Sequence, residues 1–254
     1  MARIIMIYAV LPYGLFLAVS VWMALFLLDT WTLHSSAPTS TWPVAATVDI
    51  ALISLFGLVH SIMARPAFKK VWTRIIPPAA ERATYVLQSS LFLALIFHQW
   101  QPINATIWHV EGGMSYAILT VFALGLSVIV LATFLLDHFN FTGLQQAWDN
   151  LKLAPARQSK FRTLLLYQIV RHPLQLGIVM AMFAVPHMSA DGLLFAVVML
   201  AYILIGLHFE ERPLLREFGG RYAVYMKSVP MLLPRFRVPN AGNQPRKRRI
   251  KPRA

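Results

Sequence analysis

The sequence predicts an all-α integral membrane protein: a bundle of five to six transmembrane helices, the last two a helical hairpin, plus a cytoplasmic amphipathic helix. Of the 254 residues, 57% are hydrophobic and only 13% are charged, whereas roughly 25% are charged in a typical soluble domain. A soluble fold of this size cannot bury so much apolar surface. The apolar residues fall in six stretches: 4–28, 44–63, 83–100, 115–136, 174–187 and 192–209.

The first four stretches are each long enough to cross a bilayer, which takes about 20 residues of helix. The fifth stretch is shorter and is bracketed by Pro173 and Pro186. Fourteen residues of helix rise only about 21 Å. The fifth stretch is therefore either a tilted span or one arm of a re-entrant hairpin with the sixth.

The basic residues fix the expected orientation. All 23 Lys and Arg residues fall at the amino terminus, between the second and third stretches, between the fourth and fifth, or after residue 209. The segments 29–43, 101–114 and 186–191 contain none. By the positive-inside rule both termini are cytoplasmic, so we expect a multi-pass protein of the cell inner membrane.

The chain reads as one transmembrane domain over residues 1–236, followed by a basic tail at 237–254 that we expect to be disordered. The tail's cluster of Lys and Arg suits contact with anionic lipid, and a nucleic-acid partner is not expected. The chain has no cysteine, which excludes disulfides, thiolate metal sites and a cysteine nucleophile. We expect no metal site.

Polar and ionisable residues gather at the cytoplasmic ends of the helices, where membrane-embedded ionisable groups are functional candidates. Five helix ends contribute to this face. Their residues are His60 and Ser61; Glu81, Arg82 and Tyr85; Asp137 and His138; Arg171, His172 and Gln175; and His208, Glu210 and Glu211.

The fifth stretch opens with a pattern typical of an anion site. Pro173 suits the first turn of a helix, and His172 and Gln175 flank the exposed amides of that helix start. Free N–H groups at a helix amino terminus favour a carboxylate or phosphate.

The sixth stretch ends in two adjacent acids, Glu210 and Glu211, which need a cation nearby. That cation is Arg171, Arg212 or a ligand ammonium. An anion-binding helix start beside an acidic pair would suit a zwitterion. Pro213 is expected to break the sixth helix from a following amphipathic helix, whose apolar face includes Tyr222.

The carboxyl-terminal third also carries a recognisable combination of motifs. Arg171-His172-Pro173 with Gly177, then Glu210-Glu211-Arg212, then FGGRYAVYMKSVPMLLP ending at Pro234, resembles the integral-membrane methyltransferases related to isoprenylcysteine carboxyl methyltransferase. The resemblance implies an S-adenosyl-L-methionine site formed by motifs at 167–234. The residues it implies as ligands are Arg171, His172, Pro173, Gln175, Gly177, Glu210, Glu211 and Tyr222.

In this resemblance His172 and the amides after Pro173 hold the nucleotide and carboxylate side of the cofactor, and Glu211 holds its amino group. Gln175 departs from the family pattern, which has Tyr at this position.

The upstream two-thirds narrows the resemblance. HSIMARPAFKKVW at 60–72, ERATYVLQSS at 81–90 and DHFNFTGLQQAW at 137–148 are similar to the membrane methanethiol S-methyltransferases, within the wider NnrU-like group. This resemblance covers nearly all of 1–236. It implies methylation of a small volatile thiol, methanethiol, to dimethyl sulfide at the cytoplasmic face of the membrane, with the lipid bilayer as the protein's surroundings.

A thiol must lose its proton before it acts as a nucleophile, and a neutral imidazole is the natural base near neutral pH. The candidates are His60 and His138, with Asp137 as an orienting carboxylate and Arg82 favouring the thiolate. Two alternatives stay open: a related enzyme with a larger lipid or isoprenoid acceptor, and a non-enzymatic NnrU-like transporter or assembly protein. The sequence does not fix the oligomeric state.

Overall fold

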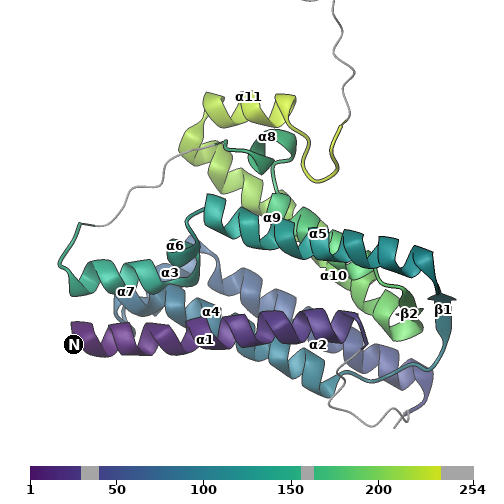
Figure 1. Ribbon diagram of the computed structural model, residues 1–254. Helices are drawn as coiled ribbons and strands as arrows, with labels where there is room; N and C mark the ends of the chain where they lie inside the picture. The colour runs from purple at the N-terminus through teal and green to yellow at the C-terminus, as the bar shows by residue number, and fades with distance from the viewer. Residues whose placement is uncertain (30–39, 156–162, 236–254) are drawn as a thin grey trace, which may run out of the picture.

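The computed structural model describes residues 1–29, 40–155 and 163–235 (Figure 1). The expected basic tail at 237–254 lies outside the described residues. The helices are α1 (Ala2–Leu27), α2 (Trp42–Met63), α3 (Pro66–Trp72), α4 (Pro78–Gln99), α5 (Gly113–Leu135), α6 (His138–Thr142), α7 (Leu144–Leu151), α8 (Leu166–Ile169), α9 (Pro173–Phe183), α10 (Ala190–Phe218) and α11 (Gly220–Ser228). Two short strands, β1 (Thr106–His109) and β2 (His187–Ser189), pair antiparallel.

The long helices lie side by side and confirm the predicted helical membrane bundle. Among the described residues α1, α2, α5 and α10 are long and apolar enough to cross a membrane. In Figure 1 the bundle runs from the amino terminus of α1 on the left to β1 and β2 on the right. We call the left-hand end, which carries the basic connections after α2 and α5, the basic end, and the end with β1 and β2 the opposite end.

The third apolar stretch forms α4, which has 22 residues, the same length as α2, but a lower mean hydropathy. α4 begins at the basic end, where Glu81 pairs with Lys69 at 3.3 Å. It ends at Trp100, whose indole Nε1 donates to Asp191 Oδ2 at 3.1 Å. Because Asp191 lies in the first turn of α10, α4 runs the full length of the bundle.

The fifth stretch crosses the bundle as half helix and half extended chain. α9 has only 11 residues, or about 17 Å of helix. Its amino terminus adjoins Glu211, because His172 Nε2 lies 3.0 Å from that carboxylate, and β2 leads directly into Ala190. The stretch therefore covers the same distance as 21 residues of α10, about 32 Å.

The extended half of this crossing keeps its backbone groups paired, as membrane-embedded irregular chain requires. The carbonyl of Val185 accepts from the Trp108 indole at 2.9 Å, and the carbonyl of Pro186 accepts from the Val110 amide at 2.9 Å. The strand pairing therefore replaces the missing turns of helix, which neither expectation for this stretch anticipated.

The expected break at Pro213 is wrong. α10 continues through Pro213 to Phe218, and the chain turns at Gly219, which has φ +55°. A proline removes one helix hydrogen bond and often bends a helix, but the left-handed backbone of a glycine ends it. The amphipathic segment is therefore the nine-residue α11, which buries Tyr222 and Tyr225.

Candidate active site

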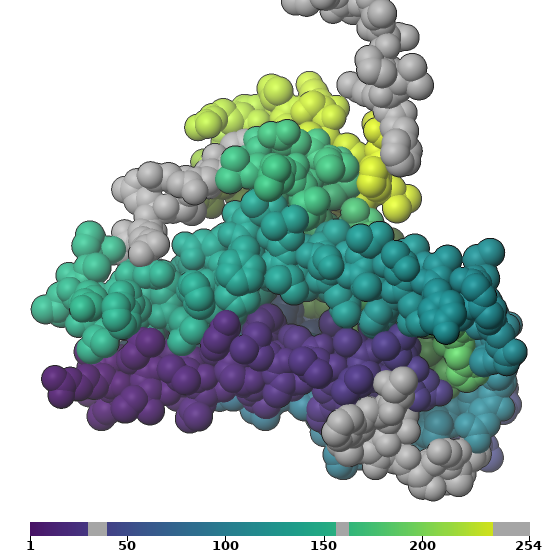
Figure 2. Space-filling view, viewed as in Figure 1, coloured from purple at the N-terminus to yellow at the C-terminus, as the bar shows by residue number. Residues whose placement is uncertain are grey.

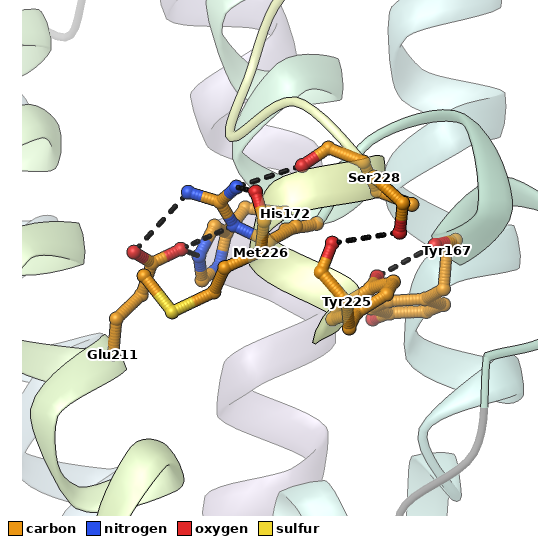
Figure 3. Close-up of polar contacts among 8 residues, drawn as sticks. Tyr167, His172, Glu211, Tyr225, Met226 and Ser228 are labelled. Atoms are coloured by element: carbon orange, nitrogen blue, oxygen red, sulfur yellow. Dashed lines mark hydrogen bonds and ion pairs between the residues drawn. The ribbon is translucent and has the colours of Figure 1, made fainter. Parts of the chain in front are cut away.

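A buried ion pair joins the start of α9 to α10 (Figure 3). Arg171 Nε lies 2.6 Å from Glu211 Oε1, and Arg171 Nη2 lies 3.2 Å from Oε2. His172 Nε2 lies 3.0 Å from the same Oε1. His172 and Glu211 are 5% and 8% exposed, so both carboxylate oxygens are occupied by the chain's own cations or hydrogen-bond donors.

Arg171 also binds the carboxyl-terminal segment to the bundle through hydrogen bonds. The amides of Arg171 and His172 donate to two carbonyls of the segment that follows α11, at Pro230 and Met231. The guanidinium Nη1 of Arg171 adds two more bonds, of 3.0 and 2.7 Å, to the carbonyls of Met226 and Val229. The cluster therefore fixes α11 relative to α9 and α10.

Three tyrosines surround this cluster. Tyr225 Oη donates to the Tyr167 carbonyl at 2.5 Å (Figure 3). Burial raises the pKa of Tyr225 to about 12, although Arg171 opposes the shift. Burial also raises the pKa values of Tyr167 and Tyr222. All three phenols are therefore neutral near pH 7 and act as hydrogen-bond donors or apolar walls.

The two adjacent glutamates have different surroundings. Glu211 is buried in the ion pair, whereas Glu210 is exposed. The Glu210 carboxylate lies within electrostatic range of Tyr167 and Tyr222, and also of Arg82 and Tyr85 on α4. Glu210 therefore lies between the α9–α11 cluster and a second polar cluster on α2 and α4.

The second cluster is built around His60, near the end of α2. His60 Nε2 lies 2.6 Å from Tyr85 Oη, and His60 Nδ1 lies 2.9 Å from Ser89 Oγ. The guanidinium of Arg82 stacks over the Tyr85 ring at 4.9 Å, and its Nε donates to the Phe141 carbonyl at 2.7 Å. The structure thus brings together two of the predicted catalytic residues, His60 and Arg82.

α10 connects the two clusters. The Tyr202 ring on this helix lies 6.5 Å from the His60 ring, and Glu211 follows nine residues later. Nine residues of helix rise about 14 Å. A ligand would therefore have to extend over about that length to contact both clusters.

The other candidate base, His138, is held in a separate pocket. His138 Nδ1 lies 2.9 Å from Thr133 Oγ1, and Nε2 lies 3.2 Å from Tyr13 Oη. The ring stacks on Phe134 at 4.5 Å, and burial lowers the pKa of His138. Asp137 caps α6 by accepting from the Asn140 amide, and Thr133 and Tyr13 contact the two ring nitrogens of His138.

The remaining predicted ligands lie in the first turns of α9. Pro173 is the first residue of α9, and the helix start has no side-chain cap among the described residues, which leaves the amides of Leu174 and Gln175 for an external acceptor. Gly177 faces α5 instead. A Cβ at Gly177 would lie 2.6 Å from the Gly125 carbonyl oxygen, so the close helix crossing requires glycine there.

Two hollows open at different ends of the bundle. One of about 350 Å³ lies at the basic end and is lined by Arg82, Phe141 and their neighbours on α3, α4, α6 and α7. The other, of about 320 Å³, lies at the opposite end, between Trp100, Asp191 and the β1–β2 strands. Only the first adjoins the polar clusters.

Sequence reasoning did not select Ser89, and it listed Tyr85 among the polar residues of the helix ends without giving it a role of its own. The two residues are four apart in α4, which puts them on one face of that helix. Their spacing was a usable signal, but its meaning depended on the rotation of α2 that brings His60 against that face. Figure 2 shows how closely the side chains of the long helices cover one another along the bundle.

The fold and site define a class: a multi-helix membrane protein whose polar clusters, formed by the ends of α2 and α10 and the starts of α4 and α9, present an exposed carboxylate, a helix amino terminus and a half-buried imidazole. Comparison with curated proteins identifies the family within this class. The chain is 47% identical over 210 residues to a protein named methanethiol S-methyltransferase from Pseudomonas deceptionensis, covering 82% of this chain and 80% of that protein. The chain belongs to the methanethiol S-methyltransferase family.

Two further relatives carry the same family name. Methanethiol S-methyltransferase 2 of Bradyrhizobium diazoefficiens is 43% identical over 236 residues, covering 91% of this chain and 90% of that protein. The methanethiol S-methyltransferase of Mycobacterium tuberculosis is 42% identical over 191 residues, covering 75% and 78%. Neither a protein-family model nor a solved structure matches the chain.

Proposed function

We propose that this protein transfers a methyl group from S-adenosyl-L-methionine to methanethiol, giving dimethyl sulfide and S-adenosylhomocysteine. The observation that carries the proposal is the extended identity to three proteins named methanethiol S-methyltransferase. The cluster geometry supports it, because the reaction needs a site for a zwitterionic sulfonium and a route for one thiol proton.

The donor set fits S-adenosyl-L-methionine, which would supply an electrophilic methyl group. The exposed Glu210 carboxylate suits its ammonium and sulfonium charges, and the uncapped amides at Leu174 and Gln175 suit its carboxylate. Tyr222 would form an apolar wall. The Arg171–Glu211–His172 cluster would hold these groups in place rather than contact the ammonium, because both oxygens of Glu211 are already bonded.

The roles of the two glutamates can be separated by binding measurements. Glu210→Gln should weaken S-adenosylhomocysteine binding in calorimetry, since a charged hydrogen bond is worth about 1.5–3 kcal/mol. His208→Gln is the matched control, because His208 lies half a turn away and pairs with Arg212 on the exposed side of α10. Equal affinity of the Glu210 variant and the control would remove Glu210 from the cofactor site.

We place this site at the cytoplasmic face of the cell inner membrane. The support is the charge asymmetry: every Lys and Arg of the sequence falls at the amino terminus, in the connections of the basic end or in the carboxyl-terminal region, where the positive-inside rule puts the cytoplasm. Both termini would then be cytoplasmic. The donor would reach the site from the cytoplasm, and a small apolar thiol would reach it through the lipid.

The acceptor is tested by competition. Purified protein with S-adenosyl-L-methionine is offered methanethiol, an isoprenoid thiol, or both, and headspace dimethyl sulfide is measured by gas chromatography. We expect dimethyl sulfide to form from methanethiol, with little inhibition by the isoprenoid thiol. Methylation of the isoprenoid thiol in preference to methanethiol would establish the larger-acceptor enzyme instead.

A further inference from the structure

Three hydrogen bonds around His60 determine where its proton lies. Ser89 Oγ donates its only proton to the Tyr85 carbonyl at 2.8 Å, so it can only accept from His60 Nδ1 at 2.9 Å. His60 therefore carries its proton on Nδ1, and Nε2 presents a lone pair. That lone pair accepts from Tyr85 Oη at 2.6 Å. The basic nitrogen of the imidazole is thus in contact with the phenol of Tyr85.

Arg82 favours negative charge on the Tyr85 oxygen during proton transfer, against the burial and the neighbouring acidic groups that oppose that charge. The Arg82 guanidinium lies between two rings, 4.9 Å from the centre of Tyr85 and 5.1 Å from that of Phe141. The other charged or titratable groups that face Tyr85 are Glu81 on α4, and Tyr202 and Glu210 on α10. Arg82 is the cation of this set in direct contact with the phenol.

Tyr85 also lies near the proposed cofactor site. Glu210, the carboxylate assigned to the sulfonium side, lies within electrostatic range of Tyr85. Tyr202, on the same helix as Glu210, places its ring near His60. A thiol between the sulfonium methyl and Tyr85 would therefore meet the phenol oxygen before it could reach His60.

We propose that Tyr85 is the group that takes the thiol proton and that His60 is the base behind it, an inference that rests on the proposed function. The S–H proton moves to Tyr85 Oη as the phenolic proton moves to His60 Nε2, leaving an imidazolium and a thiolate. The thiolate electron pair forms the new S–CH₃ bond while the methyl–sulfonium bond breaks. The imidazolium then returns its proton to solvent through the same phenol.

The chain contains a second pair of the same kind, which serves as a matched control. Tyr13 Oη lies 3.2 Å from His138 Nε2, and His138 Nδ1 lies 2.9 Å from Thr133 Oγ1. Thr133 gives its proton to the Val130 carbonyl at 2.7 Å, so this imidazole has the same tautomer. No arginine stacks on the Tyr13 ring among the described residues, and Tyr13 packs against His138 and Phe139 of α6.

The experiment compares Tyr85→Phe with Tyr13→Phe at saturating S-adenosyl-L-methionine and fixed total methanethiol, across a range of pH. Loss of a positioned acid–base group typically costs about 10²–10⁴-fold in rate, so Tyr85→Phe should lose at least about 100-fold near pH 7. The loss should narrow as pH rises, because solution then supplies thiolate. Tyr13→Phe should stay within about twofold of the unsubstituted protein.

Two further readouts separate chemistry from folding. Calorimetric affinity for S-adenosylhomocysteine should be unchanged in Tyr85→Phe. ¹⁵N NMR of the protein without ligands should show His60 protonated on Nδ1, and Ser89→Ala should shift that tautomer while Tyr85→Phe should not. A His60 protonated on Nε2 in the unsubstituted protein would overturn the proposed direction of transfer.

The outcomes also distinguish this inference from the proposed function. If the unsubstituted protein makes no dimethyl sulfide, the proposed function fails and this inference fails with it. If that protein is active but Tyr85→Phe is equally active, or its defect is the same at every pH, only the role of Tyr85 is overturned. An equal, pH-dependent defect in Tyr13→Phe would transfer the role to Tyr13 and His138.

Discussion

Replacing Arg171 by methionine should destabilise the protein strongly, because the change leaves Glu211 buried without its main cation. The Arg171 and Glu211 side chains are each 10% exposed and meet at 2.6 Å. Removing one partner of such a buried pair costs about 3–5 kcal/mol. At roughly 2–4 °C per kcal/mol for a chain of this size, the unfolding temperature should fall by about 6–20 °C.

The assay is thermal unfolding in detergent, followed by the fraction that still elutes as a folded protein after heating. Arg212→Met is the matched control, because Arg212 makes an exposed contact to His208 at 2.8 Å and exposed pairs contribute at most about 1 kcal/mol. The double variant Arg171→Met with Glu211→Met should lose less than the sum of the two single variants, since it leaves no unpaired buried charge.

Two results would refute this reasoning. If Arg171→Met unfolds within about 2 °C of Arg212→Met, the cluster is not a structural clip. If the double variant loses the full sum of the single losses, the two side chains do not act as a pair.

Three further predictions concern packing, pH and orientation. Gly177→Ala should lower the unfolding temperature, because the added Cβ would lie 2.6 Å from backbone. Gly206→Ala, where a Cβ would meet nothing within 4 Å, should be neutral or slightly stabilising. Equal unfolding temperatures for the two variants would contradict the close crossing of α5 and α9. Burial raises the pKa of Tyr225 to about 12 in the folded protein, from about 10 in an unfolded chain. The neutral phenol should therefore contribute its full stability below pH 10, and this contribution should be lost as pH rises through 12. Tyr225→Phe should therefore flatten the fall in unfolding temperature over that range, and an unchanged slope would contradict it. The chain has no cysteine, so a single introduced cysteine reports the side of the membrane on which it lies. Lys70→Cys should react with an impermeant thiol reagent only in opened cells, and Glu111→Cys should react in intact cells. The reverse pattern would invert the proposed orientation.

The helical bundle was predictable because composition and the spacing of apolar stretches depend on the membrane and not on packing detail. The fifth crossing was not, since its extended half is stabilised by bonds to Trp108 and Val110, which lie more than 70 residues away in sequence. The prediction at Pro213 failed for a similar reason: a local rule predicts a helix end there, but the helix continues for five more residues to Phe218 and ends at Gly219.

The candidate site was predictable in its members more than in their pairings. Arg171, His172 and Glu211 were identified together, and they do form one cluster. The sequence could not show that Glu211 is saturated by those neighbours while Glu210 faces outward, because adjacent residues on a helix differ by about 100° of rotation. The contact between His60 and Tyr85 likewise depends on how α2 and α4 are rotated against each other.

Transfer of an isotopically labelled methyl group tests the central claim most directly. Purified protein is incubated with S-adenosyl-L-methionine deuterated in its sulfonium methyl group and with unlabelled methanethiol, and headspace gas is analysed by mass spectrometry. The account predicts dimethyl sulfide with one deuterated and one ordinary methyl group, and loss of that product when Tyr85→Phe is assayed near neutral pH. Absence of labelled dimethyl sulfide from the folded, unsubstituted protein would contradict the claim that this site methylates methanethiol.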